Sequence, residues 1–464
     1  MAIFETRFQE YLSIVANPDT MRVVTKIEFL NPDDSVAYAL DGVYKRRYAG
    51  RADSRAFLQD GNINISLNNG QRRTANIRFE NLDNAFDYAI NKIWFGRRVR
   101  LSKGVILSNG EEFYIPQGVF YFNSPKTDWK PDSRTSEYQL VDKWAYLDGM
   151  LHGNLENTYE IAVTKNEDKT YNRPNIFNAM QGILDLSIYT HKFTELYKEK
   201  IDGITPQFTN FYNSRFCTID EYTDSNGVLI PKQTFPMSNL PHTITTSMGG
   251  TYANVILDLN NIIAGWIGYD NNGSLNVEAS QDDINDSDKP IQWDFTEFSK
   301  TFLGLEETAN PSAVYNDVMV WGENVDGSKI VGARATNYDP SSDTNANLIG
   351  LKTFVESNDN NYTNEQCQDL ANYYLKRKTV LQKSVNITCS QMFHLEENKL
   401  ISVLRSDKED SPMENHLIQA ISIPLAVDKP MTITAVSVND FPQTTNVSMD
   451  EFLNSNNITG DNNE

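Results

Sequence analysis

The sequence predicts a mainly β protein of the α+β class, in which two antiparallel β-rich regions flank a mixed α/β middle region. Three observations support this class. Alternation of apolar and polar residues recurs in the first and last thirds of the chain. Asn-Gly and similar turn sequences separate several alternating segments, which is typical of hairpins. Segments with helical spacing are few, and two of them lie in the middle of the chain.

The first β-rich region spans residues 21–148 and follows an N-terminal helix or arm at residues 1–20. Its clearest feature is a predicted hairpin, in which residues 61–70 and 72–81 alternate apolar and polar side chains. Asn69-Gly70 predicts a type I′ turn, because both residues tolerate positive φ. A second predicted hairpin has strands at 98–107 and 113–122, and a closing strand is expected at 138–141.

The remainder divides into a middle region, residues 149–295, a second β-rich region, residues 296–443, and a polar, acidic tail, residues 444–464, expected to be flexible. Helical spacing predicts helices at 175–186 and 251–264, the latter followed by a hairpin at 265–280. The second β-rich region contains a predicted helix at 363–378, which Thr363 is placed to cap. Strands are expected around it, at 313–321, 329–334, 384–389, 399–404, 416–425 and 431–438.

Net charge is 41 − 62 = −21, which disfavours nonspecific binding to DNA or to anionic membranes. Between Arg22 and Lys103, however, 15 basic residues face 9 acidic ones, a local excess of +6. This contrast predicts a basic patch that contacts an acidic protein partner, with an uneven solvated surface as the equal alternative. The candidate partner-contact residues are Arg46, Arg47, Arg51, Arg72, Arg73, Arg97, Arg98 and Arg100.

Motifs for chemistry are weak throughout, so no catalytic, cofactor or metal residue is predicted. Asp270-x-Asn272-x-Ser274 resembles the start of a calcium loop but lacks its final Glu, and a hairpin turn is the favoured interpretation. His394 beside Glu396 and Glu397 is the nearest approach to a metal site, and a surface histidine is favoured instead. Gly249-Gly250 before a helix is interpreted as an ordinary helix start.

Cysteine and tryptophan usage indicates packing. The three cysteines have no CxxC spacing and are expected to be buried, reduced thiols of a protein assembled inside a cell. Neither a signal peptide nor an apolar run of about 18 residues is visible. Core packing is the favoured role of the dispersed tryptophans, Trp94, Trp129, Trp144, Trp266, Trp293 and Trp321.

Several stretches resemble phage tail hub proteins, the family that includes the myophage baseplate hub and the siphophage tail-associated protein. The resemblance begins in residues 61–107 (GNINISLNNGQRRTANIRFEN through GVIL) and continues in EEFYIPQGVFYF at 111–122. WIGYDNNGSLNVEAS at 266–280 resembles a middle element of these proteins. Their second tube-like domain and closing strands are similar to AVYNDVMVWGEN at 313–324, residues 348–389 and HLIQAISIPLAVDKPMTITAVSV at 416–438.

This resemblance implies two tube-type, β-barrel-like domains in one chain and a homotrimeric ring that joins the tail tube to the distal tip. Its implied partners are the distal tail or tube ring above, tip or fibre proteins below, and the tape-measure protein in the lumen. DNA would pass without specific binding, and no membrane or cofactor would be involved. The implied location is the distal end of a virion tail, assembled in the host cytoplasm. An acidic lumen that repels DNA is one hypothesis for the charge excess.

The competing interpretation is a β-rich tail protein that binds or hydrolyses cell walls. It requires a pocket lined by Trp and Tyr with paired carboxylates, which meet only in the fold. A secreted adhesin is disfavoured by the missing signal peptide. The leading interpretation therefore remains a structural hub that is not an enzyme.

Overall fold

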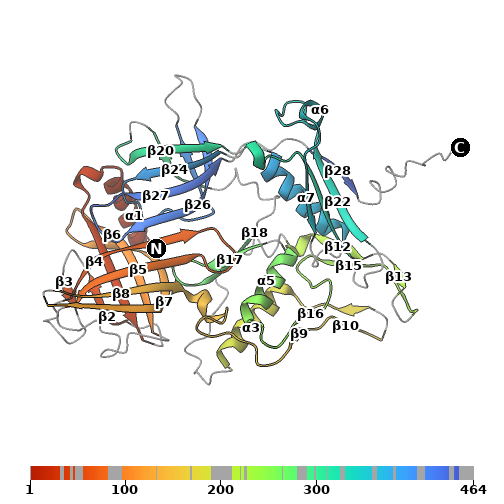
Figure 1. Cartoon of the computed structure of the whole chain (residues 1–464), viewed down its shortest axis with the longest axis horizontal. Helices are drawn as coiled ribbons and strands as arrows, with labels where there is room; N and C mark the ends of the chain where they lie inside the picture. Colours follow the sequence, from red (N-terminus) through yellow and green to blue (C-terminus); the bar gives the residue numbers. More distant parts are fainter. Residues whose placement is uncertain are drawn as a thin grey trace.

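The computed structural model describes most of the chain (Figure 1). The described residues are 2–31, 36–41, 45–47, 56–81, 97–131, 133–167, 170–189, 212–219, 221–223, 227–263, 265–279, 290–296, 299–309, 311–323, 330–357, 363–379, 383–404, 413–437 and 444–448.

Most strands within these residues belong to one 14-stranded sheet, which is antiparallel except for one parallel pair at its margin. The main path of the sheet runs through β20 (Phe302–Ala309), β24 (Lys383–Cys389), β27 (Met431–Ser437), β26 (Glu414–Pro424), β4 (Ala56–Ser66), β5 (Arg73–Asn81), β8 (Ser133–Asp142), β7 (Glu112–Lys130), β6 (Arg98–Ile106), β1 (Val23–Leu30), β2 (Val36–Asp41) and β3 (Lys45–Arg47). Off this path, β25 (Leu400–Val403) pairs with β26 and, in parallel, with β19 (Ile291–Phe295).

The two predicted β-rich regions meet where β26 pairs with β4, through Ile421 opposite Ile65 and Ile423 opposite Ile63. All four isoleucines are buried in one hydrophobic core that draws on both regions. Burying such a side chain contributes about 1.5–3 kcal/mol, which favours fusion of the two sheets over exposure of both edges. We call this combined unit the β-body. The mainly β, α+β class predicted from the sequence is confirmed.

Helix α1 (Ala2–Val15) packs on the β-body through Tyr11 and Val15, which are fully buried. The Tyr11 hydroxyl accepts a hydrogen bond of 2.8 Å from the backbone N–H of Phe393. Tyr11 and Val15 therefore lie on the side of α1 that faces the core.

The middle region has its own core, built around α3 (Ile176–Tyr189) and α5 (Tyr252–Ile263). Helix α5 leads into the hairpin of β17 (Gly265–Tyr269) and β18 (Leu275–Ala279), as the sequence predicts. The 3-10 helix η2 (Lys143–Tyr146) connects β8 to this region. Four two-stranded ladders complete it: β9 (Tyr159–Ile161) with β16 (Ile244–Thr246), β10 (Thr164–Lys165) with β11 (Tyr171–Asn172), β12 (Phe216–Ile219) with β15 (Gln233–Pro236), and β13 (Tyr222–Thr223) with β14 (Leu229–Ile230).

A third core lies between helix α7 (Asn364–Thr379) and a small sheet. The α7 N-terminus is capped reciprocally, because Gln366 N–H donates to Thr363 Oγ1 and Thr363 N–H donates to Gln366 Oε1. The sheet has the order β23 (Thr353–Ser357), β21 (Asp317–Glu323), β22 (Ile330–Asn337) and β28 (Thr444–Ser448), and the short helix α6 (Ala346–Ile349) precedes β23.

Strand β28 corrects the expectation that residues 444–464 are flexible throughout. Residues 444–448 pair with β22 from Ala333 to Asn337, because β22 offers an unpaired edge that satisfies their backbone groups. The rest of the predicted tail, residues 449–464, lies outside the described residues.

Candidate functional site

The β4–β5 hairpin extends from the β-body and contacts β17 in the middle region. Its loop, residues 67–72, carries Asn69, whose Oδ1 accepts a 2.9 Å bond from Ile267 N–H. Gly70 N–H donates to the Ile267 carbonyl at 2.9 Å. Gly70 has φ +91°, and a Cβ there would lie 3.0 Å from the Trp144 ring. The predicted type I′ turn is wrong, because Asn69 has no positive φ and the loop is opened by these contacts.

A buried carboxylate holds the base of this loop. Asp142 Oδ2 accepts bonds of 2.9 and 2.8 Å from the backbone N–H groups of Arg72 and Arg73. Its Oδ1 accepts a 3.0 Å bond from Trp144 N–H and so caps η2. Burial raises the pKa of Asp142 to about 6, although these hydrogen bonds favour the charged form. The end of β8 is thereby fastened to the start of β5 and to the middle region.

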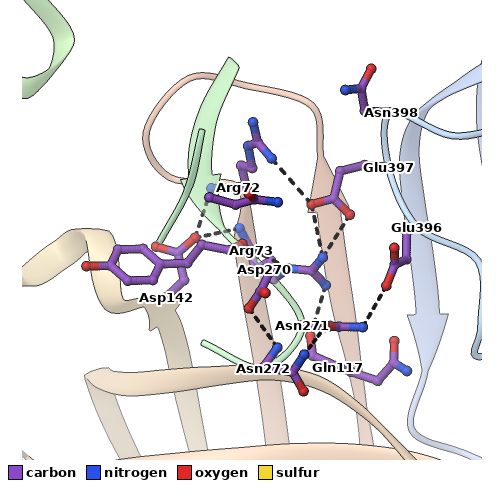
Figure 2. A network of polar contacts seen from close by, with 12 residues as sticks. Arg72, Arg73, Gln117, Asp142, Asp270, Asn271, Asn272, Glu396, Glu397 and Asn398 are labelled. Atoms are coloured by element: carbon purple, nitrogen blue, oxygen red, sulfur yellow. Dashed lines mark hydrogen bonds and ion pairs between the residues drawn. The ribbon is translucent and has the colours of Figure 1, made fainter. Parts of the chain in front are cut away.

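The guanidinium of Arg73 lies at the centre of the network shown in Figure 2. Its Nη2 donates to both Glu397 oxygens, at 2.8 and 3.0 Å. Its Nη1 donates to the Gln117 carbonyl at 3.1 Å and its Nε to the Tyr269 carbonyl at 3.2 Å. Arg73 therefore binds β7, β17 and the segment before β25 at once.

Arg72 lies on the other side of the same carboxylate, with its Nη1 3.9 Å from Glu397 Oε1 (Figure 2). Its Nε donates to the Asn68 carbonyl at 3.1 Å. Burial lowers the pKa of Arg72, and Glu397 opposes that shift. A Cβ on Gly268 would come within 2.3 Å of the Arg72 side chain, so only glycine fits beneath it.

The segment before β25 supplies further contacts to the β17–β18 hairpin. Asn271 Nδ2 donates to Glu396 Oε1 at 2.8 Å, and the Asn398 amide donates to Glu278. Burial raises the pKa of Glu396, and the neighbouring Glu397 adds to the shift. Asn398 has φ +60°, the left-handed conformation that asparagine tolerates better than most residues.

We call this network the polar joint, because its members come from the β-body, the middle region and the segment before β25. Its ion pair is buried on both sides, with exposed side-chain fractions of 3% for Arg73 and 5% for Glu397. Arg73 and Glu397 make their hydrogen bonds inside the protein, to each other and, for Arg73, also to two backbone carbonyls. The polar joint consists of Arg72, Arg73, Gln117, Asp142, Asp270, Asn271, Glu278, Glu396, Glu397 and Asn398.

The structure corrects part of the predicted basic patch. Arg72, Arg73 and Arg98 are only 2–3% exposed, so they are interior residues rather than a surface for a partner. Arg97 and Arg100 are partly exposed, and Arg100 Nη1 lies 3.3 Å from Glu28. The backbone of Arg46 and Arg47 forms β3, and Arg51 lies outside the described residues. A partner contact by the remaining arginines stays a prediction.

His394 is not the surface residue that the sequence favours. It lies between Tyr11, Phe8 and Trp293, and burial lowers its pKa to about 4. Its Nδ1 is 3.2 Å from the Tyr11 hydroxyl, so it belongs to the packing of α1. The three cysteines are buried as predicted, and burial raises the pKa of each thiol to about 12.

The calcium-loop-like turn at Asp270 and the tryptophans are the remaining features that the sequence singled out. Asp270 Oδ1 accepts from the backbone N–H groups of Asn272 and Ser274, which is the predicted hairpin turn. Among the described residues, no group of three or more His, Cys, Asp and Glu side chains is placed to hold a metal ion. Trp144 is buried, but Trp129 and Trp321 are 58% and 36% exposed, so core packing does not account for those two.

The sequence indicated only fragments of the polar joint. Glu396 and Glu397 stood out beside His394, and Arg72-Arg73 stood out as basic residues, but nothing in the sequence connected the two pairs. Asp142, Gln117 and Asn398 were missed. A usable signal was the Asp at the end of an alternating strand, directly before an aromatic-rich turn, where a side-chain cap is common.

No known protein-family profile matches the chain, and no curated protein matches it in sequence. Solved structures do match in fold. A tail protein from Neisseria meningitidis MC58 has a TM-score of 0.52 at 8% identity, covering 90% of this chain and 97% of that one. The 43 kDa tail protein of prophage MuSo2 from Shewanella oneidensis has a TM-score of 0.50 at 11% identity, covering 89% and 98%. The chain thus shares its fold with these two tail proteins, in line with the resemblance of its sequence to phage tail proteins.

In the described part of the chain, every helix is too short or too polar to cross a membrane.

Proposed function

We propose that this chain is a structural hub protein at the tip of a phage or phage-like tail. Three copies form a ring that joins the tail tube to the distal tip and lines the channel for DNA. The observation that carries the proposal is the fold shared with a tail protein over 90% of this chain and 97% of the other. The similarity thus extends over nearly the whole length of both chains and is not limited to one domain.

The polar joint supports a structural role. The bonds from Arg73 to the Tyr269 carbonyl, from Ile267 N–H to Asn69 and from Asn271 to Glu396 hold the β-body and the middle region in one orientation. A buried hydrogen-bond network of this kind gives rigidity, which a ring needs while other molecules pass through it. The chain acts in this role without catalysis. Its partners are the tube ring above, tip or fibre proteins below and the tape-measure protein, at the distal end of a virion tail assembled in the host cytoplasm.

The test is to determine the mass and symmetry of the purified protein by light scattering and negative-stain microscopy, and to locate it in tails by antibody labelling. We expect labelling at the tail tip and a threefold ring whose hole admits a duplex about 20 Å wide. A monomer in solution that labels tail tips would support assembly on neighbouring tail proteins. A monomer absent from tails that binds or degrades purified cell walls would refute the proposal in favour of the wall-acting alternative.

A further inference from the structure

Part of one face of the β-body is hydrophilic and carries no charge. It lies on β24, β27, β26, β4, β5 and β8, which Figure 1 shows side by side, and it alternates with buried residues such as Ile65, Ile77 and Ile387. We call it the neutral face. Its exposed or half-buried polar residues are Asn62, Asn64, Ser66, Thr74, Asn76, Gln139, Ser384, Asn386, Thr388, Ser422, Thr432 and Thr434, and the half-buried Ala420 and Val436 lie among them.

Strand register makes the neutral face continuous. One row crosses five strands through the paired residues Thr74, Asn64, Ser422, Thr432 and Thr388. A second row crosses three strands through Gln139, Asn76 and Asn62. The face is therefore a property of the assembled sheet, whose strands come from both ends of the chain.

Many polar groups of the neutral face bond to one another. Ser422 Oγ and Asn62 Nδ2 both donate to Asn64 Oδ1, each at 2.9 Å. Thr434 Oγ1 donates to Asn386 Oδ1 at 2.9 Å. Donors used in this way are less available to a passing anion, and the only apolar side chains among these residues, Ala420 and Val436, are half-buried and leave little surface for adhesion.

This composition departs from what the chain does elsewhere. Charged residues are 22% of the sequence. On a well-solvated protein surface, Lys, Arg, Glu and Asp make up about 25–35% of the residues. Charges appear only at the borders of the face, as at Arg78, Glu137 and Glu306. The acidic excess of the chain is therefore carried by other surfaces.

Building on the hub function proposed above, we infer that the neutral face is the channel wall along which duplex DNA passes. The duplex carries one negative charge per about 1.7 Å, so each facing Lys or Arg would form a phosphate contact that must break for movement. A neutral wall avoids these contacts. It also avoids the mutual repulsion that acidic faces would suffer when copies converge around one axis. The acidic lumen expected from composition is not needed.

The test places charges on the face in particles whose tails carry this chain. One variant combines Asn64→Lys, Asn386→Lys and Thr432→Lys, and a second places Asp at the same three positions. The control combines Gln9→Lys, Ser13→Lys and Asn347→Lys, at exposed positions on α1 and α6. We expect the facing lysines to slow DNA release by about tenfold or more, with partial relief at high salt, and the other two variants to stay within about twofold.

Each outcome decides the inference. DNA release at the native rate from particles that contain the lysine variant would overturn it and leave the hub function standing. Equal slowing by Lys and Asp would overturn it in favour of a protein that contacts the wall. Absence of the chain from tails would refute the hub function and the inference together. If the triple lysine variant does not fold, as judged by its thermal unfolding, Asn64→Lys alone is expected to give a smaller slowing of the same kind.

Discussion

Two arginine–carboxylate pairs in this protein have similar chemistry but different structural reach. Arg73 and Glu397 are 324 residues apart and are 3% and 5% exposed. Arg334 and Asp317 are 17 residues apart, on paired strands, and are 17% and 0% exposed. Arg73 of the first pair also donates to the carbonyls of Gln117 in β7 and Tyr269 in β17, whereas the second pair stays inside the small sheet. Sequence distance, more than bond geometry, therefore separates an architectural contact from a local one.

The largest effect is expected from Glu397→Ala. Removing this carboxylate leaves the guanidinium of Arg73 buried without its partner, and that of Arg72 loses its nearest anion. We expect the free energy of unfolding to fall by about 3–5 kcal/mol, as for other broken buried pairs. Urea unfolding followed by tryptophan fluorescence measures this. Glu396→Ala is the matched control and should cost about 1 kcal/mol, because it removes one bond from Asn271. Equal losses would contradict the central role of Glu397.

A smaller effect is expected from Asp142→Asn. The side-chain amide would direct N–H groups toward the backbone N–H of Arg72 and Arg73, or toward that of Trp144. We expect a loss of about 2–3 kcal/mol, since buried donors would be left unsatisfied. The control is Asp148→Asn, whose carboxylate accepts one exposed backbone bond from Met150. A loss no larger than that of the control would show that Asp142 does not hold the joint.

Asp317→Asn probes the local pair and its pH dependence. Burial alone would raise the pKa of Asp317, but bonds from Arg334, Thr353 and Thr336 outweigh it and hold the pKa below the usual 3.8. The folded state thus binds this proton less readily than the unfolded state. The resulting stabilisation is present above pH 3.8 and is lost as pH falls through the folded pKa. The stability difference between native and variant protein should therefore shrink toward pH 3 in thermal unfolding.

The loss from Asp317→Asn should also stay local. Hydrogen exchange should speed up in β21, β22 and β23, while amides of the β4–β5 hairpin keep their protection. Faster exchange in the hairpin would erase the contrast between the two pairs.

The smallest effect at neutral pH is expected from Lys103→Met. Lys103 is buried, and its Nζ donates to Thr25 Oγ1 at 3.0 Å and to the Leu425 carbonyl at 3.1 Å. Burial lowers its pKa from 10.5 to about 7. Between these values the unfolded state binds one more proton, so this lysine makes stability rise with pH. In urea unfolding, the free energy of unfolding of the native protein should therefore rise relative to that of the variant from pH 7 to pH 10. A difference between the two that stays constant over this range would contradict the lowered pKa.

Local sequence patterns predicted the elements well where neighbours in sequence are neighbours in space. Alternation placed the β4–β5 and β6–β7 hairpins, and helical spacing placed α3, α5 and α7. Patterns failed where a long-range contact decided the outcome. Asn69 does not form the expected turn because its side-chain oxygen accepts a hydrogen bond from Ile267 in β17. Strand β28 forms because its backbone pairs with the free edge of β22. Strands β19 and β20 were missed because no hairpin turn marks them.

The sequence by itself determined the α+β class and the main hairpins, because periodicity and turn chemistry act within a few residues. Only the tertiary structure decided that β26 and β4 fuse two β-rich regions into one sheet. It also decided that Arg73 is a buried partner of Glu397 and that scattered Asn, Ser and Thr residues form one neutral face. Such groupings depend on strand register across hundreds of residues, which no local pattern encodes.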